Sequence, residues 1–129
     1  MREDGFAGNM ASMGSESILS KKSYEFALQA IAAYQHLVNE KREFVLSKQF
    51  LKSATSIGAN IREARGGQSR ADFISKLSIA HKEALETEYW ICLLRDSRIL
   101  NDNKAQDLLV MVQGLIKMIA SSLLTLKGQ

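Results

Sequence analysis

An apolar stripe with heptad spacing runs through the second half of this 129-residue sequence. Its members follow one another at alternating steps of four and three residues: Phe73, Leu77, Ala80, Ala84, Thr87, Ile91 and Leu94. This spacing keeps one line of side chains on a single face of a helix, and partner helices must cover that face. The stripe therefore indicates a central helix of a helical bundle.

Three other segments have a similar periodicity, and their ends carry helix start and stop signals. Gly66 and Gly67 are expected to end one helix, because glycine readily supplies the left-handed conformation that satisfies the last carbonyls. Ser69, with Asp72 three residues later, has the form of a helix N-cap, and the run 101–103 offers another. We predict helices at about residues 21–39, 47–65, 70–97 and 102–126.

The fold class follows from composition and gap length. The chain has no proline and no sustained alternation of β-branched residues, so we expect an all-α protein. Short gaps make sequential helices antiparallel neighbours, which predicts an up-down-up-down four-helix bundle over residues 21–127. Residues 1–20 lack periodicity and are expected to be a disordered lead or a tag. The expected core positions of the first helix are Ala27, Ala30, Ile31, Tyr34, Leu37 and Val38.

The most apolar run, 108–126, could be mistaken for a membrane span. Gln113, Lys117 and Ser121 interrupt it on one face, and a lysine near the bilayer centre costs about 2.5–3.5 kcal/mol. We therefore expect a core helix and no membrane partner. The single cysteine, Cys92, excludes an internal disulfide framework. With no secretory signal in the sequence, we expect a cytoplasmic protein.

Signatures of catalysis are sparse. Neither histidine lies three residues after a glutamate, as a di-iron bundle requires, and no Walker A, G-x-S-x-G or dinucleotide motif occurs. His81 has glutamates nearby, but an ion network along a helix edge explains them. The tripeptide 66–68, Gly-Gly-Gln, matches the hydrolytic tip of release factors, yet its glycines already serve as a helix stop. We predict neither an enzyme nor a cofactor or metal.

Positive charge gathers between residues 48 and 76, where six cations face only Glu63 and Asp72. We expect a basic end of the molecule around the turn between the second and third helices, suited to phosphate contacts. Aromatic residues suited to stacking are not interleaved there, so an ordinary charged surface stays open as an alternative. The candidate nucleic-acid-binding residues are Lys48, Lys52, Arg62, Arg65 and Arg70.

The third and fourth predicted helices carry more apolar surface than one bundle core can use. Such surface usually marks an interface. The alternative is that the N-terminal segment or the first helix covers it. The candidate self-association residues are Tyr89, Trp90, Leu93, Met111 and Met118.

Three runs together resemble a bacterial family of four-helix-bundle proteins, first noticed as reading frames in intervening sequences of large-subunit ribosomal RNA genes. They are TSIGANIREA (55–64), QSRADFISKLSIA (68–80) and KEALETEYWICLL (82–94), and the likeness extends from about Ser23 to Leu126. The resemblance implies an antiparallel bundle assembled into a ring-like homopentamer. A distantly similar branch, the accessory variability determinant of diversity-generating retroelements, forms a basic pentameric barrel that binds nucleic acid and a reverse transcriptase, and its basic surface is not carried over whole to this chain.

The resemblance carries no enzymatic activity to this chain. Arg62, His81 and Leu85 depart from the family pattern, in which these places are often acidic, aliphatic and basic. We carry over only Asn60 and Glu63 as a structural polar pair, because Asn60 is flanked by core positions and needs a partner if buried.

We therefore expect a non-enzymatic homo-oligomeric bundle that binds structured RNA or DNA without sequence specificity through its basic end. The alternative is a protein-interaction scaffold for a partner such as a nucleic-acid enzyme.

Overall fold

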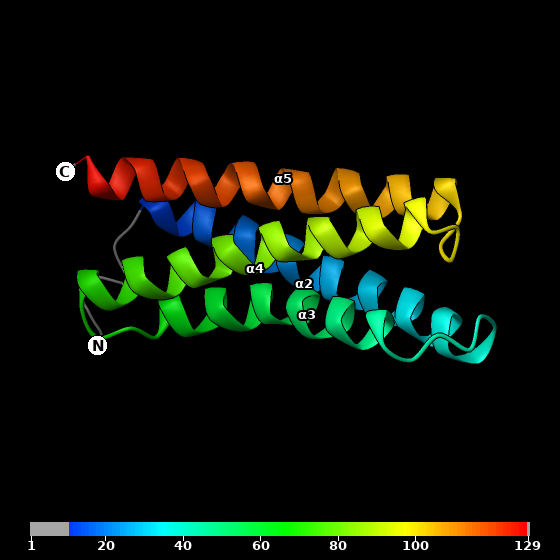
Figure 1. Ribbon diagram of the computed structural model, residues 1–129. Coiled ribbons are helices and arrows are strands. Elements are labelled where there is room, and N and C mark those ends of the chain that lie inside the picture. The colour runs from blue at the N-terminus through cyan, green and yellow to red at the C-terminus, as the bar shows by residue number, and fades with distance from the viewer. Residues whose placement is uncertain (1–10, 129) are drawn as a thin grey trace.

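A computed structural model describes residues 11–128, with side chains from Ile18 onward. Four helices fill this part of the chain, and no strand occurs within it: α2 Ala11–Asn39, α3 Leu46–Arg65, α4 Arg70–Asp96 and α5 Asp102–Lys127. Each helix runs antiparallel to the next, and α5 closes the bundle against α2 (Figure 1). The all-α prediction and the four-helix arrangement are confirmed.

The helix ends agree closely with the sequence signals, except at the start of α2. Ser69 accepts a hydrogen bond from the Asp72 N–H at 3.1 Å, and Asn101 accepts one from the Lys104 N–H at 2.8 Å, as N-caps do. In contrast, α2 begins at Ala11, ten residues before the expected start at Lys21. The predicted lead is therefore wrong for residues 11–20, and residues 1–10 lie outside the described part. Leu19 is in the core at 3% exposure.

The core face of α2 also differs from the prediction. Its buried members again alternate at steps of four and three: Leu19, Ser23, Phe26, Ala30, Ala33 and Leu37. Ile31, which was expected in the core, is 38% exposed. The reason is that α2 carries a second apolar line, Tyr24, Leu28 and Ile31, which points outward and has the same helical spacing.

The central stripe of α4 is buried along its whole length, as predicted, and α4 makes its most extensive contact with α3. Ala80 and Ala84 let the two helices approach closely. Within this contact, Thr87 Oγ1 lies 2.9 Å from Ser53 Oγ and 2.7 Å from the Glu83 carbonyl oxygen. The Ser53 hydroxyl donates to the Phe50 carbonyl at 3.1 Å, so both buried hydroxyls have partners.

In the turns, arginine and not glycine has the left-handed backbone conformation. Gly66 has φ −90°, and no glycine in the described residues has a positive φ, so the predicted left-handed glycine stop is wrong. Gly67 is instead required for close approach: a Cβ there would lie 3.0 Å from the Ala64 carbonyl oxygen. The left-handed positions are occupied by Arg42 (φ 56°) in the α2–α3 loop and Arg98 (φ 69°) in the α4–α5 loop.

The carboxylate of Glu43 caps the start of α3. It accepts the N–H groups of Val45, Leu46 and Ser47 at 3.1, 2.9 and 2.7 Å. Partial burial by itself raises the pKa of this carboxyl, but the backbone donors and the Ser47 hydroxyl outweigh it and hold the pKa below its ordinary value of 4.5. The ionised cap therefore stabilises the folded chain.

We expect Glu43→Gln to destabilise the protein at neutral pH by about 1 kcal/mol, a usual value for the loss of a helix N-cap. Because the folded pKa is lowered, the stabilisation is present above pH 4.5 and disappears as pH falls through the folded value. Urea unfolding at neutral and acidic pH should therefore show the difference from the parent shrinking in acid. Glu40→Gln, at an exposed side chain, is the control; a difference independent of pH would contradict the role of the charge.

Substitution of two glycines by alanine should change the stability of the protein in opposite directions. Gly114 lies inside α5 with nothing within 4 Å of an added Cβ, so Gly114→Ala should stabilise the helix by about 1 kcal/mol. Gly67→Ala should destabilise by roughly 1–2 kcal/mol, because its Cβ would press on the Ala64 carbonyl. Thermal unfolding of the two variants checks both signs. If both variants shifted the unfolding temperature in the same direction, the assignment of helix propensity to Gly114 and of backbone crowding to Gly67 would be wrong.

Candidate nucleic-acid interface

The outward face of α3 carries a line of cations. Lys48, Lys52 and Arg62 lie opposite the buried face of the helix, on one line with Thr55 and Ala59. All three cations are exposed, and none makes a hydrogen bond or an ion pair within the described residues. At 1.5 Å per residue the line extends for about 21 Å. We call Lys48, Lys52 and Arg62 the α3 row.

The arginines at the α3–α4 turn also hold the bundle together. Arg65 Nη1 donates to Ser20 Oγ at 3.2 Å, which ties the turn to α2. Arg70 Nη2 donates to the Leu126 carbonyl at 3.0 Å and so satisfies an acceptor in the last turn of α5. Both side chains remain exposed, so a phosphate can contact either of them from the solvent side.

The fold brings further cations to this turn. Ser20 and Leu126 contact the turn arginines, so the adjacent Lys21, Lys22 and Lys127 lie at the same end of the bundle (Figure 1). Sequence reasoning missed these lysines, because they are some 40–60 positions away from the turn along the chain and only the helix arrangement places them there.

The structure divides the predicted set of five residues. Arg62, Arg65 and Arg70 lie together near the turn, as expected. Lys48 lies in the first turn of α3, about 25 Å from Arg65 at 1.5 Å per residue. Lys52 lies about one turn closer to Arg65 than Lys48 does. The four cations of α3 are therefore spread along that helix, Arg70 begins α4, and the five do not form the compact end that the sequence suggested.

Acidic groups beside this surface have lysine neighbours. Glu63 pairs with Lys76 Nζ at 3.0 Å. Burial raises the pKa of Glu83 on α4, the Glu86 carboxylate raises it further, and Lys82 and Lys52 act in the opposite direction. The carboxylate of Glu63 is therefore matched by a cation of α4.

The expected polar pair of Asn60 and Glu63 is not formed. Asn60 is half-buried, and its Nδ2 donates to the Ser56 carbonyl one turn earlier at 2.8 Å. Glu63 points outward to Lys76. Asn60 thus satisfies its donor within its own helix, a local solution that its position among core residues did not reveal.

The outward face of α4 is apolar. Leu85, Tyr89 and Leu93 follow at steps of four residues opposite the buried stripe, with exposures of 45, 58 and 36%. Trp90 is half-buried, donates through Nε1 to Glu86 Oε2 at 3.0 Å and meets the Tyr89 ring edge-on with centroids 5.3 Å apart. We call Leu85, Tyr89 and Leu93 the α4 stripe; Leu85 was not among the predicted residues.

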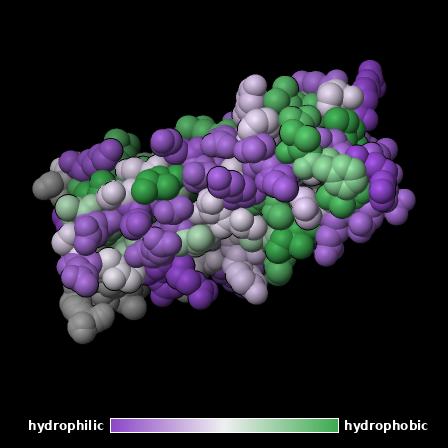
Figure 2. Space-filling model, turned by 60° about the horizontal axis from the view of Figure 1, so that its bottom comes forward, coloured by the Kyte–Doolittle hydropathy of each residue, from purple (hydrophilic) through white to green (hydrophobic). Residues whose placement is uncertain are grey.

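Met111 and Met118, also predicted at an interface, are half-buried and pack against the bundle core. Their exposed remainder is smaller than the sequence suggested. Two other outward faces carry apolar residues that sequence reasoning did not select: Tyr24, Leu28 and Ile31 on α2, and Val110 and Leu124 on α5. Hydrophobic side chains gather most densely at the end of the molecule that contains the α2–α3 and α4–α5 loops (Figure 2).

By length and composition, α5 is apolar enough to cross a membrane, the only such helix among the residues described. One of its faces forms part of the bundle core, with Leu108, Val112, Leu115 and Ile119 buried. The same composition is typical of a core helix.

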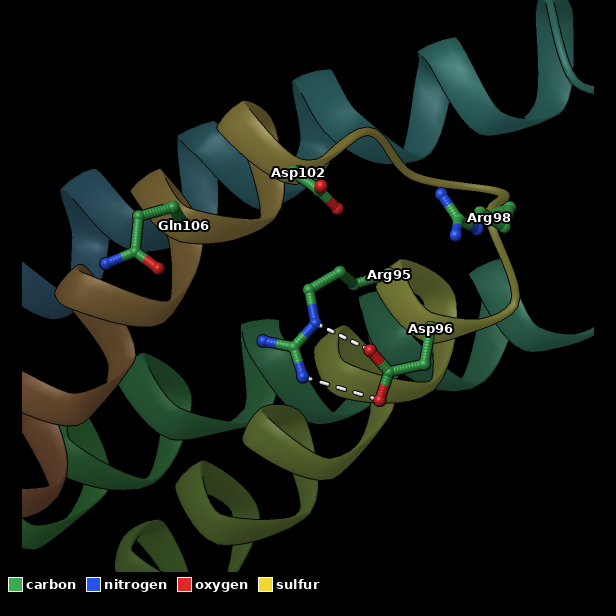
Figure 3. A pocket seen from close by; sticks show the side chains of 5 residues that line it. All are labelled: Arg95, Asp96, Arg98, Asp102 and Gln106. Atoms are coloured by element: carbon green, nitrogen blue, oxygen red, sulfur yellow. Dashed lines mark hydrogen bonds and ion pairs between the residues drawn. The ribbon is translucent and has the colours of Figure 1, made fainter.

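The α4–α5 loop borders an open depression of about 470 Å³, shown in Figure 3. The residues that line it are all polar or charged: Arg95, Asp96, Arg98, Asp102 and Gln106. Arg95 Nε donates to Asp96 Oδ1 at 2.8 Å, and this hydrogen bond lowers the pKa of the Asp96 carboxyl. Without a buried apolar floor, the depression offers little to retain a small ligand. Across residues 11–128, no group of three His, Cys, Asp or Glu side chains is placed to hold a metal.

Comparison with known proteins supports the resemblance seen in the sequence. Residues 15–121 match the family described as 23S rRNA-intervening sequence protein. The chain belongs to this family. It is also similar to the crystal structure of a protein of unknown function of the S23 ribosomal protein family from Bacteroides thetaiotaomicron: identity is 47%, the TM-score is 0.83, and the match covers 84% of this chain and 97% of that one. A search among curated proteins found no match.

Proposed function

We propose that this protein is a non-enzymatic helical bundle that binds structured RNA or DNA through the α3 row and the arginines of the α3–α4 turn. The observation that carries the proposal is the contrast between outward faces. α2 and α4 each expose an apolar line, whereas the outermost line of α3 carries Lys48, Lys52 and Arg62. The exposed acid of α3, Glu63, is paired with Lys76. A row of exposed cations on one helix face attracts an anionic partner.

The dimensions of the surface suit a polyanion. Phosphates on one strand of a stacked nucleic acid rise by about 3.4 Å each along the helix axis, so an α3 row parallel to that axis spans roughly six of them. Lysine and arginine contacts to phosphate release counterions and give affinity without reading bases. The expected binding is therefore strongly dependent on salt and weakly dependent on sequence.

Self-association is the second part of the proposal. The α4 stripe is a continuous exposed apolar line, and such lines are uncommon on monomers. Burying it against a second copy would remove it from water, and a ring-like homopentamer is the form that the resemblance implies. Repetition of the α3 row around an assembly would strengthen its field. A cytoplasmic location agrees with a nucleic-acid partner.

The alternative function is a protein-interaction scaffold. The apolar line on α2 and the exposed Val110 and Leu124 on α5 favour it, because they offer contact area to a partner such as a nucleic-acid enzyme. The two functions differ in what the α3 row contacts, and direct binding measurements separate them.

Charge reversal on the α3 row should weaken nucleic-acid binding. Five phosphate contacts predict that raising salt from about 50 to 200 mM weakens binding of the parent to an RNA duplex roughly 500-fold. For the double variant Lys52→Glu/Arg62→Glu, we expect affinity to fall at least about tenfold and the salt slope to decrease by about 2. Fluorescence anisotropy at both salt concentrations gives these values.

The matched control is Lys104→Glu/Lys117→Glu, which changes net charge equally on α5. If it weakens binding as much as the row variant does, the effect is one of net charge and not of this surface. Absence of parent binding at about 50 mM salt, where phosphate contacts are strongest, would overturn the proposal. The scaffold would then be favoured if the parent captured a protein partner from nuclease-treated lysate and Lys52→Glu/Arg62→Glu did not.

Self-association should depend on the α4 stripe. We expect light scattering of the parent at micromolar concentration to give a multiple of 14.4 kDa, and Tyr89→Glu/Leu93→Glu to shift the mass towards one chain, because charge opposes burial of that face. Lys82→Glu, at an exposed position of the same helix, changes charge without removing apolar surface. A parent that is monomeric would refute the interface.

A further inference from the structure

The α2–α3 loop exposes an aromatic ring and an aliphatic side chain. Phe44 is 50% exposed and Val45 is 70% exposed. The Arg42 guanidinium lies over the Phe44 ring, with Cζ 5.5 Å from the ring centroid, which is cation–π geometry. The loop lies at the end of the molecule where Figure 2 shows the densest hydrophobic surface.

The exposure of this loop does not result from a lack of structure. Glu43, between Arg42 and Phe44, accepts three backbone N–H groups, and its own carbonyl accepts the Ser47 hydroxyl at 2.7 Å. These bonds hold the two residues that follow Glu43 against the start of α3. Phe44 is therefore presented from a fixed backbone, as a binding side chain must be.

Arg42 occupies the left-handed region, with φ 56°. Glycine is the usual residue there, and a side chain with a Cβ is strained in this conformation. Residues held in such conformations cluster at ligand contacts and switch regions. What Arg42 provides and glycine lacks is the guanidinium that covers the ring of Phe44.

This loop leads directly into the α3 row. Lys48 follows Phe44 by four residues and begins the line that continues through Lys52 to Arg62. The other exposed aromatic side chains, Tyr24 and Tyr89, lie on the apolar outward faces of α2 and α4. Among the described residues, Phe44 is thus the exposed aromatic that adjoins a line of unpaired cations.

We propose that the Arg42–Phe44 pair stacks an unpaired base of a single-stranded RNA or DNA segment whose phosphates lie along the α3 row. Aromatic rings and arginine planes are the usual platforms for unstacked bases, and neighbouring cations hold the backbone. The inference rests on the proposed function and adds to it a preference for nucleic acid with unpaired nucleotides. It also supplies the exposed aromatic side chain that the window 48–76 lacks, since Phe50 and Phe73 within that window are buried.

An anionic membrane is the competing partner for an apolar tip flanked by Lys41, Arg42 and Lys48. The geometry favours the strand. Cations that serve a membrane gather around the inserted tip, whereas here they continue for about 21 Å along one helix. A linear polyanion can follow such a line.

The test compares a single-stranded RNA of about 12 nucleotides, within the 4–16 typical of single-strand sites, with a blunt RNA duplex. One base of the single strand is 2-aminopurine, whose fluorescence is quenched by stacking. We expect Phe44→Ala to weaken single-strand binding about 5- to 150-fold, the equivalent of about 1–3 kcal/mol per stacked base, and to abolish the quenching. Duplex binding should change less than twofold. Phe44→Trp should restore both signals, and Val45→Ala should leave them unchanged.

Each result is decisive. Single-strand binding by Phe44→Ala equal to that of the parent would overturn this inference, and if duplex binding persists the proposed function stands. A parent that binds neither probe would overturn both. Binding of the parent to vesicles of phosphatidylserine and phosphatidylcholine, lost in Phe44→Ala and unaccompanied by quenching, would assign the loop to a lipid surface instead. Circular dichroism of the exposed-loop variants establishes that they are folded.

Discussion

The close packing of α3 against α4 is the contact on which the other features depend. Small side chains let the two helices approach, and the hydroxyls of Ser53 and Thr87 meet across the contact at 2.9 Å. Each hydroxyl also lies within hydrogen-bond distance of a carbonyl in its own helix, so neither depends on the other for a partner. The rotation of α3 is fixed instead by its buried face, because turning the helix would expose Phe50, Ile57 and Ile61 to water. Because that rotation is fixed, Lys48, Lys52 and Arg62 must point to solvent.

The outward faces of the four helices differ in the kind of side chain that they expose. Ordinary surfaces intersperse charged residues of both signs with isolated apolar ones. Here α2, α4 and α5 each expose apolar residues, while α3 exposes cations. A binding partner that covers apolar faces, whether a second copy or another protein, would leave α3 as the accessible side. Self-association and polyanion binding are therefore compatible uses of one bundle, and assembly would not bury the cationic surface.

Much of the architecture could be predicted because its signals are local. The Ser69 and Asn101 caps mark two helix starts, and the buried stripe of α4 keeps its alternating steps of four and three residues from Phe73 to Leu94. The core face of α2 could not be chosen in this way, since Phe26 and Ile31 belong to two lines of equal periodicity and only packing decides between them. The partners of Asn60 and Glu63 depended on side-chain directions within α3 and on its neighbour α4. The spread of the five cations was misjudged because distance along the chain was taken for proximity in space.

The two loops at one end of the bundle allow backbone strain to be distinguished from the contact between a guanidinium and an aromatic ring. Arg42 and Arg98 both hold a left-handed backbone, with φ 56° and 69°. Only Arg42 covers an aromatic ring; Arg98 instead borders a polar depression beside Asp102. Relief of strain by glycine should act similarly at the two positions, since the backbone conformations are alike. An effect on nucleic-acid binding that is confined to Arg42 therefore cannot arise from strain, and must come from the guanidinium and the ring beneath it.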